Sequence, residues 1–544
     1  MCQRSTLSTL GVVLVATLLN AVKPVHIDDA AYLTFAEQIV SDPAHPYAFE
    51  MFWYDAPQPA LDVLAPPVYL YWLAFARWIA PENPVVWHLL VFPWLLVMAV
   101  SMNWLAVWFR GKTSPWLIAA FLMSPVVLPG INLMLDVPAL ALALAALAMF
   151  TNSLDRTSTR QALLAGLLLA VAMQTKYTAA TMFPVWLGVA WLSRTHRRWH
   201  CLTIAVAVAL FSVVACESWI AWGHGQSHLL RQLSLKRDGF ETPLVVYLGQ
   251  IALAVPAVTL LGLVRLWRSR GQNHLASLAL AALLSVFAML AFAVYAGTLS
   301  VAFAMFIGLS CLLALAAPWL GAEGPGQAFL GWYFLCEVVY CIWVSPFPAM
   351  RRVLGPSVPL ILLACGAQKP LRETTIRWIA CLSIASGLGF WCLDFQAAQL
   401  QRQAASVLAE KYADLDGRIW FAGHWGWEFY AKQAGMRPIV SGRSQVRPGD
   451  IIVIPRQIAC QRFEQPPQAR HLETFSLQLS PLLPVTLKRY YGGALQLLPE
   501  ADQGFVAEIY RVDAPAQIRA SRTDAQDGQA KTRVMEFVAS PSAK

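Results

Sequence analysis

The sequence predicts a mainly α-helical, polytopic membrane protein with a small α/β domain at its C-terminal end. Of the 544 residues, 58% are hydrophobic and only 13% are charged. A soluble domain has no core large enough to bury so much apolar surface, so most of the chain is expected to lie in lipid. After Cys392 the composition turns polar and the apolar runs become as short as strands.

Thirteen apolar runs are the expected membrane spans, although several are shorter than the ~20 residues of a straight span. The first run follows Arg4 and ends near Val22; it resembles a signal peptide, but no small-residue cleavage site follows, so we expect an uncleaved span. The runs lie at roughly 6–22, 85–109, 115–131, 137–150, 162–174, 178–192, 201–222, 244–266, 276–296, 299–319, 328–345, 353–366 and 377–393.

Segment 66–80 decides the orientation of every later span. If it lies on the membrane surface, the short basic loops all fall on one face, as the positive-inside rule requires of the cytoplasmic face. We therefore predict an interfacial helix at 66–80. The cytoplasmic basic residues are then Arg4, Arg110, Lys112, Arg156, Arg160, Arg194, Arg197, Arg198, Arg265, Arg268, Arg270, Lys369 and Arg372.

This orientation places three acids, Asp28, Asp29 and Asp136, on the non-cytoplasmic face. Acids at the mouths of spans are costly and usually mark chemistry or transport. The predicted location is a multi-pass protein of the plasma (inner) membrane. Its site and its C-terminal domain are expected on the periplasmic or extracellular side.

The predicted domains are a transmembrane unit at 1–393, which includes a first outer loop at 24–84, and an α/β domain at 394–512. In the latter, 418–422 and 450–454 have the pattern of buried strands, and Trp427–Ala434 has the pattern of a helix ended by Gly435. Residues 513–544 are poor in apolar side chains and are expected to be a disordered tail.

Composition excludes several functions. The net charge of +9 lies in short clusters between apolar runs, which is typical of membrane orientation and not of nucleic-acid binding. Most of the ten cysteines lie inside apolar spans, without a CxxC motif or a disulfide framework. No Walker or GxGxxG motif is present, so a nucleotide-driven pump is not expected.

The acidic pair Asp28-Asp29 precedes a predicted helix at 30–40. One acid is explained as an N-cap, but a cap needs only one. The other could be a general base for an acceptor hydroxyl or amine. His26 and Asp28 also have the chemistry of ligands for a divalent cation. Asp136 precedes Pro138 and has the same two interpretations, an N-cap or a second carboxylate that orients the acceptor or holds a metal.

Cations on the same face are candidate phosphate ligands. Lys176 lies at a turn between two spans, where a snorkelling lysine at a helix end is the alternative. Arg351 and Arg352 form a pair that suits a phosphate, with lipid headgroups as the competing partner. Acids and cations beside an apolar groove suggest a phosphate-headed lipid as the substrate.

These features together resemble the GT-C membrane glycosyltransferases, in particular the branch of protein O-mannosyltransferases and lipid A aminoarabinose transferases. The resemblance covers roughly residues 1–393 and depends on the order of several short motifs. They are Asp28-Asp29-Ala30-Ala31-Tyr32 with Ala36, Pro66-Pro67-Val68-Tyr69, Asp136-Val137-Pro138, Thr175-Lys176, and the Arg-rich turn from Arg351 to Pro359.

The resemblance implies inverting transfer of a sugar from a polyprenyl-phosphate donor to a lipid, glycan or protein acceptor outside the cytoplasm. It implies Asp28 as the base, supported by Asp29 and Asp136. The family commonly has Asp-Glu in place of Asp28-Asp29, so the base could be Asp28 or Asp29. Many relatives also have a phosphate-binding lysine where this chain has Ala65. The phosphate must therefore be bound by other residues here, and Lys176 and Arg351 are the expected ones.

Two other functions are weighed against transfer. A transporter or flippase for a lipid-linked sugar would carry charges deep inside spans. Few acids lie inside the predicted spans, and the exceptions are Glu217 and Glu337. Hydrogen bonding within a helix bundle explains both of them. A non-catalytic scaffold would leave Asp28, Asp29 and Asp136 free to change.

Overall fold

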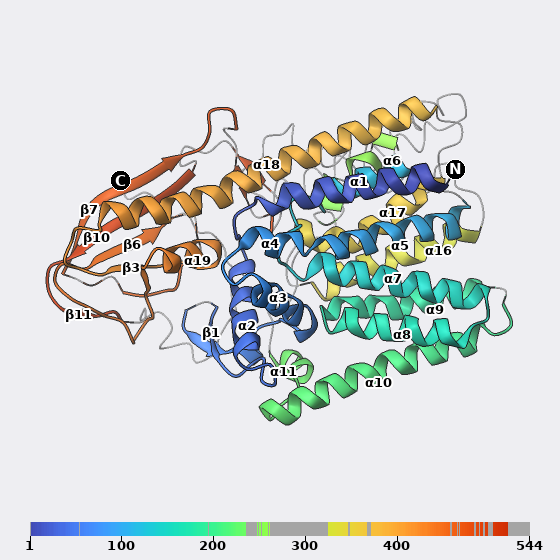
Figure 1. Cartoon of the computed structure of the whole chain (residues 1–544), viewed down its shortest axis with the longest axis horizontal. Coiled ribbons are helices and arrows are strands. Elements are labelled where there is room, and N and C mark those ends of the chain that lie inside the picture. Colours follow the sequence, from blue (N-terminus) through green and yellow to red (C-terminus); the bar gives the residue numbers. More distant parts are fainter. Residues whose placement is uncertain are drawn as a thin grey trace.

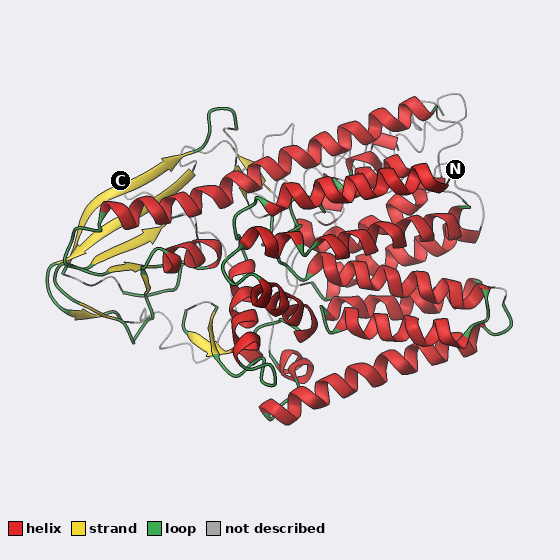
Figure 2. Ribbon diagram, viewed as in Figure 1, coloured by secondary structure: helices red, strands yellow, loops and turns green. Residues whose placement is uncertain are grey.

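A bundle of helices carries a β-sheet region at one end in the computed structural model of the chain (Figures 1 and 2). The description covers 2–235 except 54, 112 and 194; then 247, 250, 251, 253–258, 260 and 261; then 325–345, 349–366 and 372–519. Within the last range it omits 457, 459, 465, 467, 484, 485, 489, 493–495 and 499–503.

The helices of the bundle run between two ends, and α2, which begins at Asp29, lies at the end that carries the sheet (Figure 1). The α-helices are α1 (Cys2–Ala21), α2 (Asp29–Ser41), α3 (Pro67–Ile79), α4 (Pro84–Leu89), α5 (Phe92–Arg110), α6 (Pro115–Leu122), α7 (Asp136–Asp155), α8 (Thr159–Met173), α9 (Met182–Leu192), α10 (Arg198–His224), α11 (His228–Ser234), α16 (Pro325–Trp343), α17 (Leu354–Gly366), α18 (Glu373–Lys411) and α19 (Trp425–Gln433). The 3-10 helices are η1 (Ala60–Asp62), η2 (Tyr177–Thr181) and η3 (Met350–Val353).

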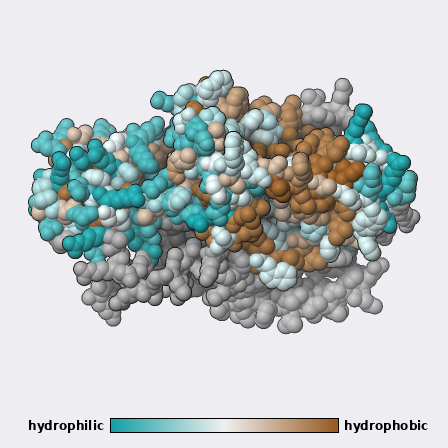
Figure 3. Space-filling model, turned by 90° about the horizontal axis from the view of Figure 1, so that it is seen from below, coloured by the Kyte–Doolittle hydropathy of each residue, from teal (hydrophilic) through white to brown (hydrophobic). Residues whose placement is uncertain are grey.

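The chain is a membrane protein by the length and composition of its helices. Four described segments are long and apolar enough to cross a bilayer: Pro84–Arg110, Asp136–Asp155, Arg198–His224 and Glu373–Lys411. On the face drawn in Figure 3, apolar residues gather over the bundle and hydrophilic residues over the sheet region. The predicted total of about thirteen spans is not confirmed, and 276–296 and 299–319 lie outside the described residues.

The segment predicted as an interfacial helix forms α3, which has 13 residues. At 1.5 Å per residue it is ~20 Å long, shorter than the ~30 Å hydrocarbon core of a bilayer. It packs against α2, which lies across the ends of the bundle helices (Figure 1). Arg77 near its end is paired with Glu37 at 2.8 Å and stacks over Trp87. The interfacial location of α3 stays a prediction.

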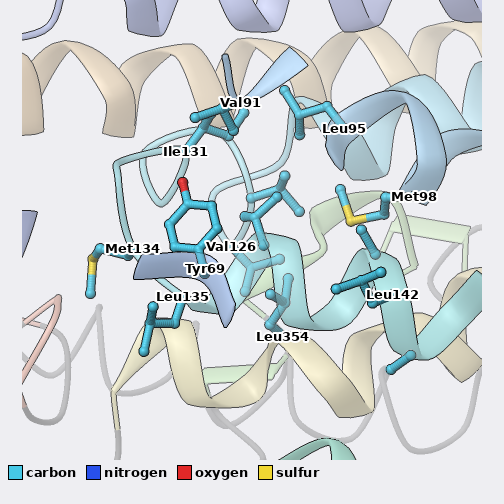
Figure 4. Packing of buried hydrophobic residues seen from close by; sticks show 14 of the residues in the cluster. Tyr69, Val91, Leu95, Met98, Val126, Ile131, Met134, Leu135, Leu142 and Leu354 are labelled. Carbon is cyan, nitrogen blue, oxygen red and sulfur yellow. The ribbon is translucent and has the colours of Figure 1, made fainter. Parts of the chain in front are cut away.

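The span predicted at 115–131 is wrong in its second half. The helix α6 ends at Leu122, and 123–135 is irregular yet largely buried. Pro125 and Pro129 explain the break, because each lacks an N–H and disfavours helix in the residue before it. Figure 4 shows Val126 and Ile131 packed among buried side chains of neighbouring elements such as Leu95. Irregular backbone is tolerated at this depth only where protein surrounds it.

The C-terminal region contains a five-stranded sheet with the order β4-β3-β6-β10-β7. The predicted strands appear as β3 (Ile419–Phe421) and β6 (Ile451–Pro455), which are parallel and joined through α19, while β10 is antiparallel to β6 and β7. The remaining strands are β1 (Glu50–Phe52), β2 (Pro57–Pro59), β4 (Arg437–Pro438), β5 (Gln445–Val446), β7 (Ala469–Gln478), β8 (Thr486–Lys488), β9 (Gln496–Leu498), β10 (Gly504–Val512) and β11 (Ala516–Gln517).

Two predicted boundaries of this region differ from the structure. The predicted domain start at residue 394 falls inside α18, which continues from the bundle without a break and packs on α19. The predicted disordered tail begins too early, because β11 pairs with β5 and the side chain of Ile518 is buried. The rest of the predicted tail, from residue 520, lies outside the described residues.

Candidate functional site

A strained turn precedes the acidic pair Asp28-Asp29. Ile27 has a φ of 49°, which is unusual for a β-branched residue, and the amide of Asp29 donates to the carbonyl of His26 at 3.2 Å. The side chain of Asp28 remains 10% exposed, whereas Asp29 is completely buried. The turn therefore gives the two neighbouring acids different environments.

Asp28 occupies the N-cap position of α2, but its carboxylate does not cap the helix. Its side chain makes no cap hydrogen bond to α2. Instead Nη1 of Arg351 donates to Oδ2 of Asp28 at 2.8 Å, across 323 positions of sequence. The carboxylate therefore makes a charge-assisted hydrogen bond to a guanidinium in place of a cap bond to the helix. The capping interpretation therefore fails for Asp28.

Asp29 is held as a neutral acid at physiological pH. Its Oδ2 accepts a hydrogen bond from the amide of His26 at 3.1 Å. Burial raises the pKa of Asp29 to about 8 despite that amide and the nearby Lys23. A protonated, inaccessible carboxyl group cannot take a proton from an acceptor, so the environment distinguishes Asp28 from Asp29.

Asp136 is the second acid of the site and is also not a cap. It starts α7, whose N-cap residue is Leu135, and it pairs with Nζ of Lys176. Nη1 of Arg351 lies 3.9 Å from its Oδ2. Arg351 thus lies between Asp28 and Asp136. The site joins residues from four parts of the chain, which are the first loop, the second loop, the turn before η2, and η3 itself.

The two cations retain capacity for an anion. Burial lowers the pKa of Lys176 to about 8, although Asp136 opposes the change. The guanidinium of Arg351 has five N–H donors, of which Nε and Nη1 bond to Tyr491 and Asp28. Its Nη2 makes no hydrogen bond to a described residue, so this nitrogen can donate to an oxyanion.

A small cavity of about 60 Å³ opens beside these groups. It lies between α7, η2, α9, α16, η3 and α17. Small residues such as Ala139, Ala143 and Ala179 form its apolar wall, and the charged groups of its lining are Asp136, Lys176, Glu337, Arg351 and Arg352. All three predicted phosphate ligands therefore line one cavity. Asp28 adjoins it through Arg351.

The predicted metal ligands His26 and Asp28 do not converge. Nε2 of His26 lies 3.6 Å from Oδ1 of Asp394, while Asp28 is engaged by Arg351. Burial lowers the pKa of His26 to about 4, so the ring is neutral. Among the described residues no group of three or more His, Cys, Asp or Glu could hold a metal ion. The residues present do not fit a divalent cation at His26 and Asp28.

The two acids inside spans are hydrogen-bonded, as predicted for a helix bundle. Glu217 accepts from Gln174 at 2.9 Å, from Tyr177 at 2.8 Å and from groups at the start of α11. Glu337 accepts from Thr181 at 2.9 Å and also lines the cavity. Arg231 on α11 makes a two-pronged ion pair with Asp62 at 2.6 and 3.0 Å.

A second buried charged cluster was missed by the sequence reasoning. Lys23 is completely buried, forms an ion pair with Asp394, and donates to the carbonyl of Pro129 at 2.7 Å and to Oδ1 of Asn132 at 2.6 Å. The signal was available: Lys23 is a cation on the face that otherwise carries acids, the same anomaly that singled out Lys176. Its partner Asp394 lies too far along the chain for a sequence pattern to assign.

Comparison with known proteins gives matches at the level of structure alone. No protein-family model matches the chain, and no curated protein matches it. Solved structures of GT-C glycosyltransferases are its structural neighbours. The crystal structure of ArnT from Cupriavidus metallidurans bound to undecaprenyl phosphate has 12% identity and a TM-score of 0.47, and the match covers 94% of this chain and 98% of ArnT.

The oligosaccharyltransferase of Archaeoglobus fulgidus is a second neighbour. Its apo crystal structure has 13% identity and a TM-score of 0.45, with 79% of this chain and 64% of that chain covered. This chain therefore spans less than two thirds of the length of that enzyme. The same enzyme in complex with Zn and sulfate has 13% identity and a TM-score of 0.45, with 82% and 68% covered.

Proposed function

We propose that this chain is an integral-membrane glycosyltransferase that moves a sugar from a polyprenyl-phosphate donor to an acceptor. The observation that carries the proposal is the cavity in which Lys176, Arg351 and Arg352 meet Asp136, with Asp28 bound to Arg351 at its edge. An anion-binding wall, an apolar wall and a partly exposed carboxylate are the parts that such a transfer needs.

The proposed reaction is a single displacement. Asp28 accepts the proton of the acceptor hydroxyl or amine as that atom attacks the anomeric carbon of the donor sugar. The bond between the anomeric carbon and the phosphate oxygen breaks, and the electron pair leaves with the polyprenyl phosphate. Attack opposite to the leaving group inverts the anomeric centre. Lys176 and Arg351 stabilise the negative charge that develops on the leaving phosphate.

Each remaining site residue has a supporting role in this proposal. Arg352 lines the same cavity and adds positive charge for the phosphate. Asp136 holds Lys176 and lies near Arg351, so it orients the two phosphate ligands. Asp29 is a buried neutral acid that fixes the turn before α2, so we assign the base to Asp28 and not to Asp29.

The proposed site lies on the non-cytoplasmic face of the plasma (inner) membrane. The cavity lining includes Asp136 at the start of α7, and α7 begins at the end of the bundle where α2 and α3 lie (Figure 1). The transmembrane unit (1–393, with its outer loop at 24–84) would carry catalysis, and the C-terminal region would lie on the same face as the acceptor. The acceptor is a lipid, a glycan or a protein, and bilayer lipids contact the apolar surface of the bundle.

Binding of a polyprenyl monophosphate tests the anion site directly. We expect purified protein in nanodiscs to bind this lipid, and we expect Lys176→Ala and Arg351→Ala each to weaken binding about 10-fold or more, because each removes a charge-assisted contact. Arg377→Ala is the matched control, since Arg377 forms an exposed ion pair with Glu373 at the start of α18. Equal affinity in all four proteins would refute the anion site.

The pH dependence of donor use should report Lys176. Its pKa of about 8 means that it is protonated below pH 8 and loses its charge above it. The donor phosphodiester keeps one negative charge over this range, so kcat/KM for the donor should fall as the pH rises above about 8. In Lys176→Arg the guanidinium stays charged, and the falling limb should move to higher pH. An unchanged limb in that variant would assign it to another group.

The orientation of α3 is accessible to labelling. A single cysteine introduced between residues 81 and 84, after the end of α3, should react with a membrane-impermeant maleimide added outside intact cells. A cysteine introduced beside Arg156, in the turn after α7, should react only after permeabilisation. The reverse pattern would place the cavity on the cytoplasmic face.

A further inference from the structure

The segment Tyr490-Tyr491 belongs to the C-terminal region but is buried in the helix bundle. It follows β8, and its two side chains are only 1% and 7% exposed. The rings lie 4.7 Å apart at a steep angle. Two adjacent tyrosines with buried hydroxyl groups require partners, and these partners define what the segment does.

The backbone of this segment holds the turn that presents Arg351. The amide of Met350 donates to the carbonyl of Tyr490 at 3.0 Å. Nε of Arg351 donates to the carbonyl of Tyr491 at 3.1 Å. One bond fixes the main chain of η3 and the other fixes the guanidinium, so the direction in which Nη1 and Nη2 point depends on a segment about 140 residues further along the chain.

The side chains anchor the same segment in the bundle. The hydroxyl of Tyr490 donates to the carbonyl of Pro125 at 2.7 Å. The hydroxyl of Tyr491 lies 2.8 Å from Oδ2 of Asp394 and 3.0 Å from the carbonyl of Pro129. The amide of Asn132 donates to the same hydroxyl at 3.0 Å. The tyrosines thus occupy the break after α6 and satisfy carbonyl groups that have lost their helical partners.

Tyr491 also contacts the turn that presents Asp28, the acid that pairs with Arg351. Its ring meets that of His26 edge to face, with the centroids 5.8 Å apart. His26 supplies the amide that holds Asp29 and precedes Asp28 by two positions. One residue therefore contacts both the turn that presents Asp28 and the guanidinium that binds it.

We infer that Tyr490-Tyr491 is a positioning segment. Through it the C-terminal region, most of which lies outside the bundle, sets the geometry of the Arg351–Asp28 pair. The inference builds on the proposed function, because it gives the C-terminal region a part in the transfer. The segment touches neither the acceptor nor the donor in this assignment. It acts through Arg351, and losing it should disturb the base and the phosphate ligand together.

The test compares Tyr490→Phe, Tyr491→Phe and the double variant with Tyr430→Phe in the full-length protein. Tyr430 is a matched control, because its hydroxyl also joins the C-terminal region to the first loop, at the amide of Val25 and 2.8 Å away, but it does not contact Arg351. We expect kcat/KM to fall about 10- to 100-fold in the double variant, the loss typical of a misplaced catalytic group. The Tyr430→Phe variant should stay within a factor of about two.

Affinity for polyprenyl monophosphate separates positioning from general destabilisation. Arg351 is a proposed phosphate ligand, and its guanidinium is held by the carbonyl of Tyr491. If the guanidinium is misplaced, the folded double variant should bind this lipid more weakly, by up to about 10-fold, the loss expected when one charge-assisted contact is removed. Loss of folded protein alone lowers the number of binding sites and leaves the affinity of the folded fraction unchanged.

Three results would decide the matter. A lower kcat/KM with weaker binding of polyprenyl monophosphate, in protein that melts as a single folded species, supports the inference. A folded double variant with the wild-type rate and the wild-type affinity overturns it. If the variants fold poorly, binding of polyprenyl monophosphate to the folded fraction decides, and affinity equal to wild type again overturns it. A wild-type protein that transfers no sugar would refute the proposed function instead, which is a separate outcome.

Discussion

Asp28→Asn is expected to reduce the rate of transfer by about 10²- to 10⁴-fold, the contribution typical of a general base. The amide keeps the shape of the side chain and a hydrogen bond to Arg351, so the fold and donor binding should change little. The loss should therefore appear in kcat, with the apparent affinity for the polyprenyl donor near that of the wild type. Single-turnover transfer with saturating donor measures it.

Asp29→Asn is the matched control, and it should be close to wild type in activity. Asp29 has a pKa of about 8 and is fully buried, so the amide resembles the protonated form already present at pH 7. Folding of the wild type takes up a proton here between about pH 4 and pH 8, so this residue lowers stability as the pH rises through that window. The Asn variant should melt at a higher temperature at pH 7. If Asp29→Asn lost activity while Asp28→Asn kept it, the general base would be Asp29 and not Asp28.

Arg351→Ala should have the second largest effect, about 10²- to 10³-fold in kcat/KM for the donor. Two losses combine: the leaving phosphate loses a charge-assisted contact, and Asp28 and Asp136 are left facing each other without the cation between them. Removing one partner of a buried pair is also destabilising by about 3–5 kcal/mol, so a thermal melt must accompany the kinetics.

Arg351→Lys separates these losses. A lysine restores one positive charge but not the fork that bonds to Asp28 and Tyr491 at once. We expect the melting temperature to recover more than kcat/KM does. Full kinetic recovery in Arg351→Lys would show that charge alone is needed, and the geometric role of the guanidinium would then be wrong.

Much of the fold follows from local patterns in the sequence. Apolar runs locate most helices, Pro66-Pro67 starts α3, and the run ended by Gly435 locates α19. Prediction fails where tertiary contacts override the pattern. The apolar run at 115–131 reads as one span, but Pro125 and Pro129 break it, and donors from distant segments stabilise the break.

The same limit applies to the candidate site. Charge on the wrong face singles out Lys176, and the acids at the mouths of spans single out Asp28 and Asp136. The sequence does not show which of Asp28 and Asp29 is accessible to an acceptor, because the burial of each side chain decides this. It also cannot pair Lys23 with Asp394 or place Tyr491 beside Arg351, because these partners lie at least 140 residues apart.

The most direct test of the account is transfer of radiolabelled sugar in isolated membranes, wild type against Asp28→Asn, with a panel of polyprenyl-phosphate sugars and endogenous acceptors. The account predicts that label from one donor moves to an acceptor in wild-type membranes and not with Asp28→Asn. No transfer from any donor, with wild-type protein folded and able to bind polyprenyl phosphate, would contradict it and favour a transporter or flippase of lipid-linked sugar.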